Sequence, residues 1–336
     1  MARLAVTRRG FGRAVATGAA LIAAPLIIMP SRGLFAQSAP AGTIALADLN
    51  RMSLADFVAV LGETFERAPW VAELAYAKRP FATVKGLHET MFEILKAAPR
   101  EKQLALLTGG VGVLAAGGAS RAANIAGESK QEQASVGLDT MSDADAARFK
   151  LMSDAYRAKF GFSFVIAVMR YTREAIMIAL ERRLANDAAT EFAAAIQEIF
   201  YISRLRVAAR VTGDGMPQVN GLLDTHVLDA TSGKPAVGMS IELFEFTFEQ
   251  ARRIGQTKTN DDGRNATPLI AGRPLPIGRY ELRFGVGDYF RTRAQGLNNP
   301  PFLDIVPLRF SVAEPETHYH VPLLCTPWSY STYKGS

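Results

Sequence analysis

The sequence predicts an α + β multidomain protein, with an all-α half followed by an all-β half. Between residues 44 and 208 apolar side chains recur at helical spacing, whereas beyond residue 220 polar and apolar residues alternate. The stretch TGDGMPQVN (residues 212–220) separates the two patterns and has the Gly and Pro content of a linker. We therefore expect a helical domain over 44–208, a linker over 209–220 and a β-sandwich over 221–336.

Residues 1–38 have the organisation of an export signal. TRRGFGR precedes the apolar run AVATGAALIAAPLIIMP, and AQS follows as a small-x-small cleavage pattern. The run contains Pro25 and is shorter than the ~20 residues of a spanning helix. Arg8 and Arg9, with Phe11 after them, resemble a twin-arginine signal. We expect a periplasmic or secreted protein without stable membrane anchoring; ordinary secretion and an uncleaved anchor are the alternatives.

The charge distribution argues against a nucleic-acid partner. Of the 38 basic residues, five arginines lie in residues 1–37, which contain no acid, so 33 basic and 32 acidic residues remain beyond them. Cys325 is the single cysteine, which excludes an intramolecular disulfide. The chain has neither a Gly-rich phosphate loop after a predicted strand nor a Cys–His metal spacing. We expect no cofactor.

Four segments of the first half predict amphipathic helices. SLADFVAVLGETFERAPW begins with Ser53 and Asp56, and SDADAARFKLMSDAYRAKF begins with Ser142 and Asp145, both in the spacing of a capping box. TREAIMIALERRLAND and AATEFAAAIQEIFYISRLRVAARV are rich in the helix formers Ala, Leu, Glu and Arg. Little in this half indicates a strand.

The second half predicts a series of short strands. THVLDATSGKPAVGMSIELFEF indicates two strands around a Gly-Pro turn, and RYELRFGVGDYF, LRFSVA and HYHVPLL indicate three more. Turn signals recur about every ten residues, which is typical of a β-sandwich.

Three of the four histidines lie on predicted strands of the second half. His318 and His320 are two residues apart and so share a face, His226 lies in an earlier strand, and Arg264 lies on a predicted turn. Two imidazoles without a third ligand nearby in the sequence are a weak metal site, so we expect no metal. Each histidine alone is best explained as structural, whereas the three together with Arg264 indicate a site.

These residues carry a resemblance. The second half resembles the 5-hydroxyisourate hydrolases, the transthyretin-like enzymes of urate breakdown. The segments that carry this resemblance are LLDTHVLDATSGKPAVGM, TNDDGR, GDYF, PFLDIVPLRF, HYHVPLL and the terminal YSTYKGS. The resemblance covers about residues 220–336 and implies a transthyretin-type sandwich that forms a homotetramer, with active sites at an interface between dimers. It implies catalytic roles for His226, Arg264 and His320. It implies substrate binding by Tyr333, Lys334, Gly335 and Ser336.

The implied chemistry suits these side chains. A neutral histidine can take a proton from water, and the planar fork of Arg264 can orient a urate-like ring and stabilise an oxyanion. Which histidine is the base is left open. Lys334 stands where the family usually has Arg, so the charge is kept while the bidentate fork is lost.

The first half resembles another family of the same pathway, the decarboxylases of 2-oxo-4-hydroxy-4-carboxy-5-ureidoimidazoline (OHCU). The resemblance covers about residues 44–208. It is carried by the segments LNRMSLADFVAVLGETFERAPWVAE, KRPF, SKQEQASVGLD, YRAKFGFSFVIAV and ISRLRV. It implies a substrate pocket formed by Ser129, Glu132, Gln133, Phe162, Ser163, Phe164, Val165 and Ile166. A buried apolar run is the plainer explanation of FGFSFVIAV.

The histidine on which that decarboxylase family depends is missing. Its A-H-P-x-L motif corresponds to LALLTGGVGVLAAGG (residues 104–118), where Gly109 or Gly110 stands nearest the histidine. His88 lies on a different predicted helix, and we expect it to be a helix-surface or packing residue. Because general acid–base help is worth about 10²–10⁴ in rate, we expect impaired decarboxylation. Three explanations are open. The helical half is a degenerate decarboxylase kept as a dimerisation or packing module, or it is an active enzyme with an unusual catalytic arrangement. Otherwise a local sequence error conceals a normal motif.

We therefore expect an enzyme that hydrolyses 5-hydroxyisourate to OHCU, with a helical half of impaired activity. One alternative is a fully bifunctional allantoin synthase that also decarboxylates OHCU to S-allantoin. Another is a non-catalytic protein that binds purine-like ligands. The expected partners are the small-molecule substrate and further copies of the chain.

Overall fold

The computed structural model describes residues 42–108, 131–132, 141–248 and 250–335. The predicted signal segment, residues 1–38, lies outside the described residues. None of the described helices combines the length and apolar content needed to cross a membrane.

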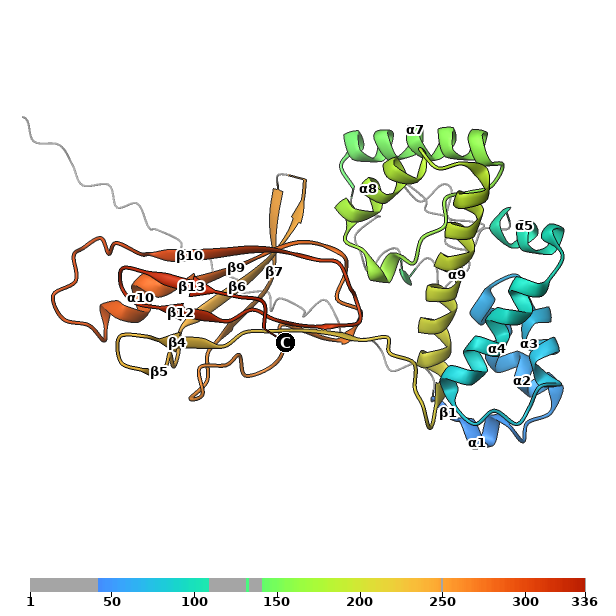
Figure 1. Cartoon of the computed structure of the whole chain (residues 1–336), viewed down its shortest axis with the longest axis horizontal. Coiled ribbons are helices and arrows are strands. Elements are labelled where there is room, and N and C mark those ends of the chain that lie inside the picture. The colour runs from blue at the N-terminus through green and yellow to red at the C-terminus, as the bar shows by residue number, and fades with distance from the viewer. Residues whose placement is uncertain (1–41, 109–130, 133–140, 249, 336) are drawn as a thin grey trace, which may run out of the picture. The chain divides into compact units, whose positions relative to one another are not determined.

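The first half is helical, as predicted (Figure 1). Its elements are β1 (Ile44–Ala45), α1 (Leu46–Leu49), α2 (Leu54–Leu61), η1 (Gly62–Phe65), α3 (Pro69–Tyr76), α4 (Val84–Ala97), α5 (Arg100–Thr108), α7 (Asp143–Phe160), η4 (Val168–Arg170), α8 (Arg173–Arg183), α9 (Ala188–Arg210) and β2 (Val211–Thr212).

The predicted helix starts are confirmed. The hydroxyl of Ser53 accepts the N–H of Asp56 at 3.2 Å, and that of Ser142 accepts the N–H of Asp145 at 3.1 Å. Each bond satisfies one of the amide groups that a first helical turn leaves without a partner. The apolar faces of these helices form one core, to which Phe57, Leu87, Phe149 and Ile199 contribute fully buried side chains.

One feature of this half is not predicted. β1 pairs in parallel with β2, with Ile44 opposite Val211, so the two ends of the helical segment are joined by a short sheet. A two-residue strand is too short for its periodicity to be recognised in the sequence.

The second half is a two-layer β structure, as predicted. Its elements are β3 (Gly221–Asp224), β4 (Val227–Asp229), β5 (Lys234–Pro235), β6 (Ser240–Thr247), β7 (Gln250–Lys258), β8 (Ile270–Arg273), β9 (Gly278–Gly285), α10 (Val286–Arg291), β10 (Ile305–Val312), β11 (His318–His320), β12 (Leu323–Cys325) and β13 (Tyr330–Thr332). One sheet has the antiparallel order β10-β9-β6-β7.

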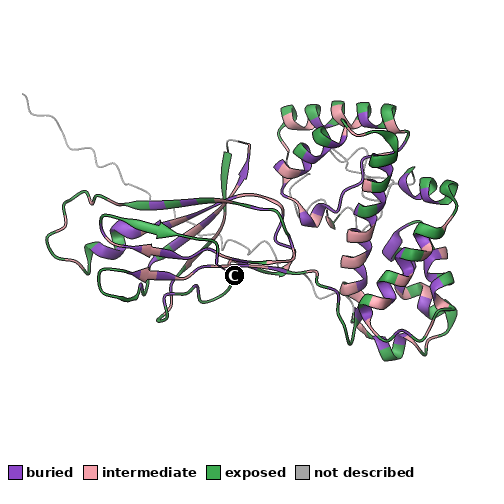
Figure 2. Ribbon diagram, viewed as in Figure 1, coloured by how far each residue is buried: buried purple, intermediate pink, exposed green. Residues whose placement is uncertain are grey.

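The opposing layer consists of two shorter sheets with the orders β11-β3-β8 and β13-β12-β4-β5. β3 and β4 are consecutive parts of one run of chain, as are β11 and β12, and the two runs pair in parallel on both sides of the interruption. The predicted continuous strand HYHVPLL is thus divided after His320. The core between the layers contains Ile241, Leu282, Phe284 and Leu323, all fully buried, and Figure 2 shows buried and exposed positions alternating along several strands.

The strand predicted over RYELRFGVGDYF is wrong at its end. β9 stops at Gly285, and residues 286–291 form α10. Val286, Tyr289 and Phe290 are buried at the spacing of a helix face. The apolar positions of this stretch fit both periods, and packing against the sandwich core selects the helix.

Candidate active site

The interruption between β3 and β4 brings the predicted catalytic segments together. Thr225, fully buried at this point, donates its hydroxyl to the carbonyl of Val321 at 2.7 Å and its N–H to the side chain of Asn265 at 2.8 Å. The N–H of Leu323 donates to the carbonyl of His226 at 2.9 Å. Three segments that are distant in sequence are therefore held at one place by Thr225 and its neighbour.

His226 is half-buried, and its Nε2 atom is buried without a hydrogen bond to any described residue. Burial lowers the pKa of His226 below its ordinary value of 6.5, and the positive charge of Arg264 lowers it further, with a smaller contribution from His320. The imidazole is therefore neutral at pH 7. A neutral ring with one open nitrogen is suited to accept a proton.

The turn that carries Arg264 is tightly built. The side-chain oxygen of Asn260 accepts the N–H groups of Asp262 (3.0 Å) and Arg264 (2.9 Å). Gly263 has φ +74°, and a Cβ there would lie 2.4 Å from the carbonyl oxygen of Val227, so only glycine fits. The backbone of Arg264 forms a bridge with that of His226, and its side chain is exposed.

His320 lies beside an acidic residue that sequence reasoning missed. Nδ1 of His320 is 2.6 Å from Oδ1 of Asp224, and Nε2 of His318 is 3.0 Å from the same oxygen. The shared face of His318 and His320 is thus confirmed. Asp224 stands two positions before His226, but its pairing with a residue 96 positions away becomes visible only in the fold.

The same three side chains are the ones with metal-binding geometry among the described residues. Asp224, His318 and His320 each offer a ligand atom, and these atoms lie within 4.8 Å of one another. A carboxylate on the neighbouring strand thus lies beside the two imidazoles, which the local sequence does not show. The expectation of no metal stays a prediction.

The last residues of the chain lie against His320. The N–H of Gly335 donates to the carbonyl of His320 at 2.9 Å. The ammonium group of Lys334 is 4.9 Å from the ring centroid of Tyr319, which is a cation–π contact. Tyr333 is exposed, and Ser336 lies outside the described residues. The terminal segment thus adjoins the predicted site.

In the helical half, Glu132 takes part in a buried charge cluster. Arg206 on α9 donates from Nε and Nη2 to the two oxygens of Glu132, each at 3.0 Å, and from Nη2 to Glu66 at 3.1 Å. Only 3% of the Arg206 side chain is exposed. Arg206 is the last arginine of ISRLRV, and the sequence predicts no site role for it. Ser129 and Gln133, the other polar residues predicted for this pocket, lie outside the described residues.

Most of the predicted apolar pocket segment is core. Phe162, Phe164, Val165 and Ile166 are buried, whereas Ser163 is half-buried. The guanidinium of Arg183 donates to the carbonyl of Val165 at 2.8 Å, which holds this non-helical segment against α8. The packing explanation accounts for these side chains, and their role in binding stays a prediction.

His88 is a packing residue, which is the second of the two alternatives predicted for it, rather than a residue of a helix surface. It is 1% exposed, its Nε2 is 2.9 Å from the hydroxyl of Ser203, and its ring centroid is 4.8 Å from that of Phe200. Burial lowers its pKa to about 3, assisted by the charge of Arg204. The residues 109–118, where the decarboxylase histidine is missing, lie outside the described residues.

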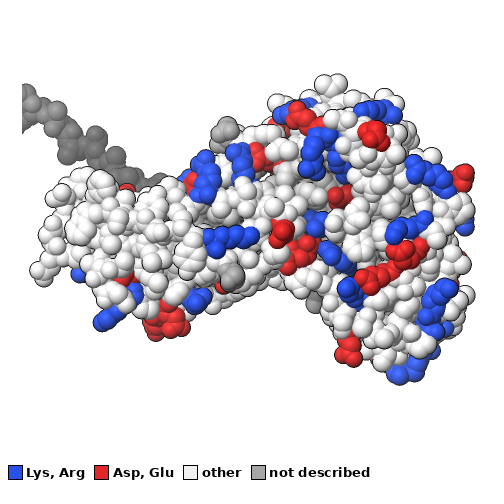
Figure 3. Space-filling model, viewed as in Figure 1, with Lys and Arg blue, Asp and Glu red and all other residues white. Residues whose placement is uncertain are grey.

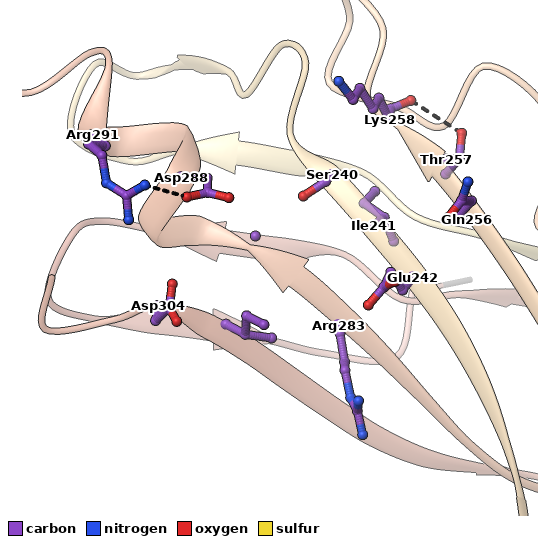
Figure 4. Close-up of a pocket in the computed structure, with 12 residues that line it drawn as sticks. Ser240, Ile241, Glu242, Gln256, Thr257, Lys258, Arg283, Asp288, Arg291 and Asp304 are labelled. Atoms are coloured by element: carbon purple, nitrogen blue, oxygen red, sulfur yellow. Dashed lines mark hydrogen bonds and ion pairs between the residues drawn. The ribbon is translucent and has the colours of Figure 1, made fainter. Parts of the chain in front are cut away.

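A separate pocket of about 690 Å³ lies at the other sheet (Figure 4). It is lined by β6, β7, β9, α10 and the start of β10, and its charged groups are of both signs. Arg291 donates to Asp288 at 2.8 Å, and the hydroxyl of Thr257 donates to the carbonyl of Lys258. None of the predicted catalytic residues lines this pocket, and we assign it no role.

A two-layer sandwich that holds His226, Arg264 and His320 at one place, in one chain with a helical domain, defines a transthyretin-like protein fused to an all-α partner. Comparison with known proteins identifies both parts. The OHCU decarboxylase family model matches residues 50–208, and the HIUase/transthyretin family model matches residues 223–335.

Individual relatives of each half support the same two families. A 5-hydroxyisourate hydrolase of Ralstonia nicotianae is 51% identical over 116 residues, covering 34% of this chain and 99% of the relative. An OHCU decarboxylase of Haloferax volcanii is 37% identical over 171 residues, covering 51% of this chain and 98% of the relative. The chain therefore belongs to both families, with a decarboxylase domain before a hydroxyisourate hydrolase domain.

A crystal structure of (S)-allantoin synthase is 31% identical, covers 87% of this chain and 100% of its own, and superposes with a TM-score of 0.47. A 5-hydroxyisourate hydrolase of Klebsiella pneumoniae is also 31% identical and covers 34% of this chain, with a TM-score of 0.29.

Proposed function

We propose that the sandwich domain hydrolyses 5-hydroxyisourate to OHCU. The observation that carries the proposal is the position of His226: its Nε2 has no hydrogen bond to any described residue, and its backbone forms a bridge with that of Arg264. Burial and Arg264 lower the pKa of this imidazole, which favours the neutral ring. Membership of the hydrolase family supplies the substrate class. The reaction is the hydrolysis of a cyclic amide, which requires a base for water and a positive group for the developing oxyanion.

Each predicted catalytic residue has a separate role in this hydrolysis. One imidazole, His226 or His320, accepts a proton from water as the water oxygen bonds to the ring carbonyl carbon. Arg264 stabilises the negative charge on the carbonyl oxygen. The carbon–nitrogen bond of the ring then breaks, the proton passes to the departing nitrogen, and a carboxylate remains. Tyr333 and the backbone of the terminal segment hydrogen-bond to the substrate.

We propose further that a second copy of the chain completes the site, in a homotetramer formed through the sandwich. Trp328, Tyr330 and Tyr333 are large apolar side chains that are 46–63% exposed in one copy. In the view of Figure 3 much of the sandwich surface lacks charged side chains, whereas charges of both signs mix over the helical domain. Such a surface suits a contact between copies. A monomeric variant that hydrolysed the substrate at full rate would overturn this.

The helical domain supports a second candidate function, decarboxylation of OHCU. Glu132, Arg206 and Glu66 form a charge cluster in which Arg206 and Glu66 are buried and Glu132 is 23% exposed, which supports a retained polar pocket. Against it stands the stretch 104–118, which has no histidine to move a proton. We propose a domain of weak activity, and resequencing of codons 104–118 tests whether the motif is truly absent.

Export through the leader is also a proposal. The paired Arg8 and Arg9 before an apolar run support it. Fractionation of cells that express the whole chain, with N-terminal sequencing of the mature protein, tests both the compartment and cleavage near Ser38.

One experiment separates the candidate functions. The protein is added to 5-hydroxyisourate generated from urate by urate oxidase, and ultraviolet absorbance and circular dichroism are followed together. Fast decay with accumulation of OHCU supports a hydrolase with a weak helical domain. Fast conversion to optically pure S-allantoin supports a bifunctional enzyme. Decay no faster than without protein overturns the hydrolase and favours a ligand-binding protein.

A further inference from the structure

We propose that Asp224 is a positioning residue of the hydrolase site, which keeps the proton of His320 on Nδ1 and leaves Nε2 as the basic atom of that ring. The proposal rests on the proposed hydrolase function. It concerns a residue for which neither the family resemblance nor the charge pattern of the sequence suggests a role.

The backbone places the two side chains together. β11 pairs in parallel with β3, and in this register His320 lies opposite Asp224. Side chains of directly opposed residues stand on the same face of a sheet. The N–H of Val321 also donates to the carbonyl of Asp224 at 3.1 Å, so the register is held immediately beyond the pair. The contact is thus a consequence of strand pairing rather than of a flexible side chain.

The short contact determines which nitrogen carries the proton. Oδ1 of Asp224 is 2.6 Å from Nδ1 of His320. An ionised carboxylate only accepts hydrogen bonds, so Nδ1 must be the donor. In the neutral ring the other nitrogen, Nε2, then has the lone pair. The same division of roles holds the histidine of a serine-protease triad in its working tautomer.

The opposite edge of the ring is also held. A Cβ on Gly335 would lie 2.5 Å from Cδ2 of His320, the carbon next to Nε2. Rotation of the ring by half a turn would exchange Nδ1 with Cδ2 and lose the bond to Asp224. The carboxylate and the terminal segment therefore fix the ring from two sides.

His318 is the second histidine in contact with Oδ1 of Asp224. Its Nε2 is 3.0 Å from Oδ1, and its side chain is 41% exposed, against 14% for His320. The shorter and more buried contact is the one with His320. His318 therefore lies at the rim, where its loss leaves the Asp224–His320 contact intact.

The test compares two carboxylate replacements in the full-length chain. Asp224→Asn keeps the shape but places an amide donor or a weaker acceptor beside Nδ1, so we expect kcat to fall about 10²-fold with KM changed less than about threefold. Asp224→Glu keeps the acceptor at the cost of a larger side chain, and we expect it to be faster than Asp224→Asn. A purely structural role predicts the reverse order, because Asn is the isosteric change.

Asp154→Asn is the matched control, since it makes the same change at an exposed pair with Lys150 in the helical half, and its kcat should stay within about threefold of wild type. If Asp224→Asn is as fast as wild type, the positioning role is overturned while the hydrolase stands. If the wild-type chain does not hydrolyse 5-hydroxyisourate at all, the proposed function itself fails.

A second readout does not depend on activity. The chain has four histidines, so ¹⁵N-histidine labelling gives a simple two-bond ¹⁵N–¹H spectrum, in which the His320 signals are assigned by their loss in His320→Gln. We expect a Nδ1–H tautomer for His320 in wild type and its loss in Asp224→Asn. A Nε2–H tautomer in the wild-type protein would overturn the proposal.

Discussion

Gly335 and His320 approach so closely that a single methyl group on Gly335 would lie 2.5 Å from Cδ2 of the imidazole. The N–H of Gly335 donates to the carbonyl of His320 at 2.9 Å, and the two residues form an isolated bridge. The segment that contains Gly335 therefore lies against the predicted site.

Gly335→Ala tests this contact. The added methyl must displace the ring of His320, and because small misplacements of a catalytic group are costly, we expect hydrolase kcat to fall about 10- to 100-fold. Gly255→Ala is the control, because its methyl would meet Leu243 at 3.8 Å, an ordinary contact. Steady-state kinetics and thermal melts of both variants decide the matter; equal rates for the two would contradict the prediction.

The depressed pKa of His226 predicts the acid limb of the pH–rate profile. Burial and Arg264 favour the neutral ring, so a general base at His226 stays active below pH 6.5 and loses activity only at lower pH. The measurement is kcat/KM against pH. An acid limb at or above pH 6.5 would exclude His226 as the group that controls it.

Replacement of Arg264 should move that limb. In Arg264→Gln the positive charge beside His226 is removed, so its pKa rises and the acid limb shifts to higher pH, together with a lower kcat from the lost oxyanion partner. Arg293→Gln, a substitution away from the site, should leave the profile in place. A lower kcat with an unmoved limb would mean that Arg264 acts on the substrate alone.

Because His88 is buried with a lowered pKa, we expect the free energy of unfolding to decrease at acid pH. Its pKa is about 3 when folded and near 6.5 when unfolded, so the unfolded state binds more protons at low pH. Stability from this group is complete above pH 6.5 and falls as the pH decreases towards 3, by about 2 kcal/mol at pH 5. His88→Phe should flatten the dependence of the unfolding free energy on pH.

Ser203→Ala is the control for His88. It removes the hydroxyl near Nε2 but leaves the burial that mainly depresses the pKa, so the steep pH dependence should persist. Urea unfolding at pH 5 and pH 7 compares the three proteins. Identical slopes for wild type and His88→Phe would show that another group is responsible.

We expect the ion pairs of Arg206 to stabilise the helical domain. Arg206→Met leaves Glu132 and Glu66 without their buried cation, and breaking such a cluster costs about 3–5 kcal/mol. Arg148→Met removes an exposed pair with Glu181 and should cost at most about 1 kcal/mol. Urea unfolding followed by circular dichroism at 222 nm measures both. Similar losses in the two variants would contradict the assignment of a buried cluster.

Much of the fold follows from local patterns. The capping serines Ser53 and Ser142, the change of period after residue 220 and the shared face of His318 and His320 all depend on neighbours a few residues apart. The sequence does not predict the helix α10, because its apolar spacing suits a strand equally well. Only its packing on the core distinguishes the two.

The sequence by itself determined the two domain types, their families and the predicted catalytic residues, because helix and strand periodicity and family motifs are properties of short stretches. The tertiary structure alone decided that Asp224 holds His320, that Arg206 joins Glu132 to Glu66, and that Gly335 closes against an imidazole. These contacts join residues 15 to 140 positions apart. Strand register and helix packing set such distances, and no local pattern encodes them.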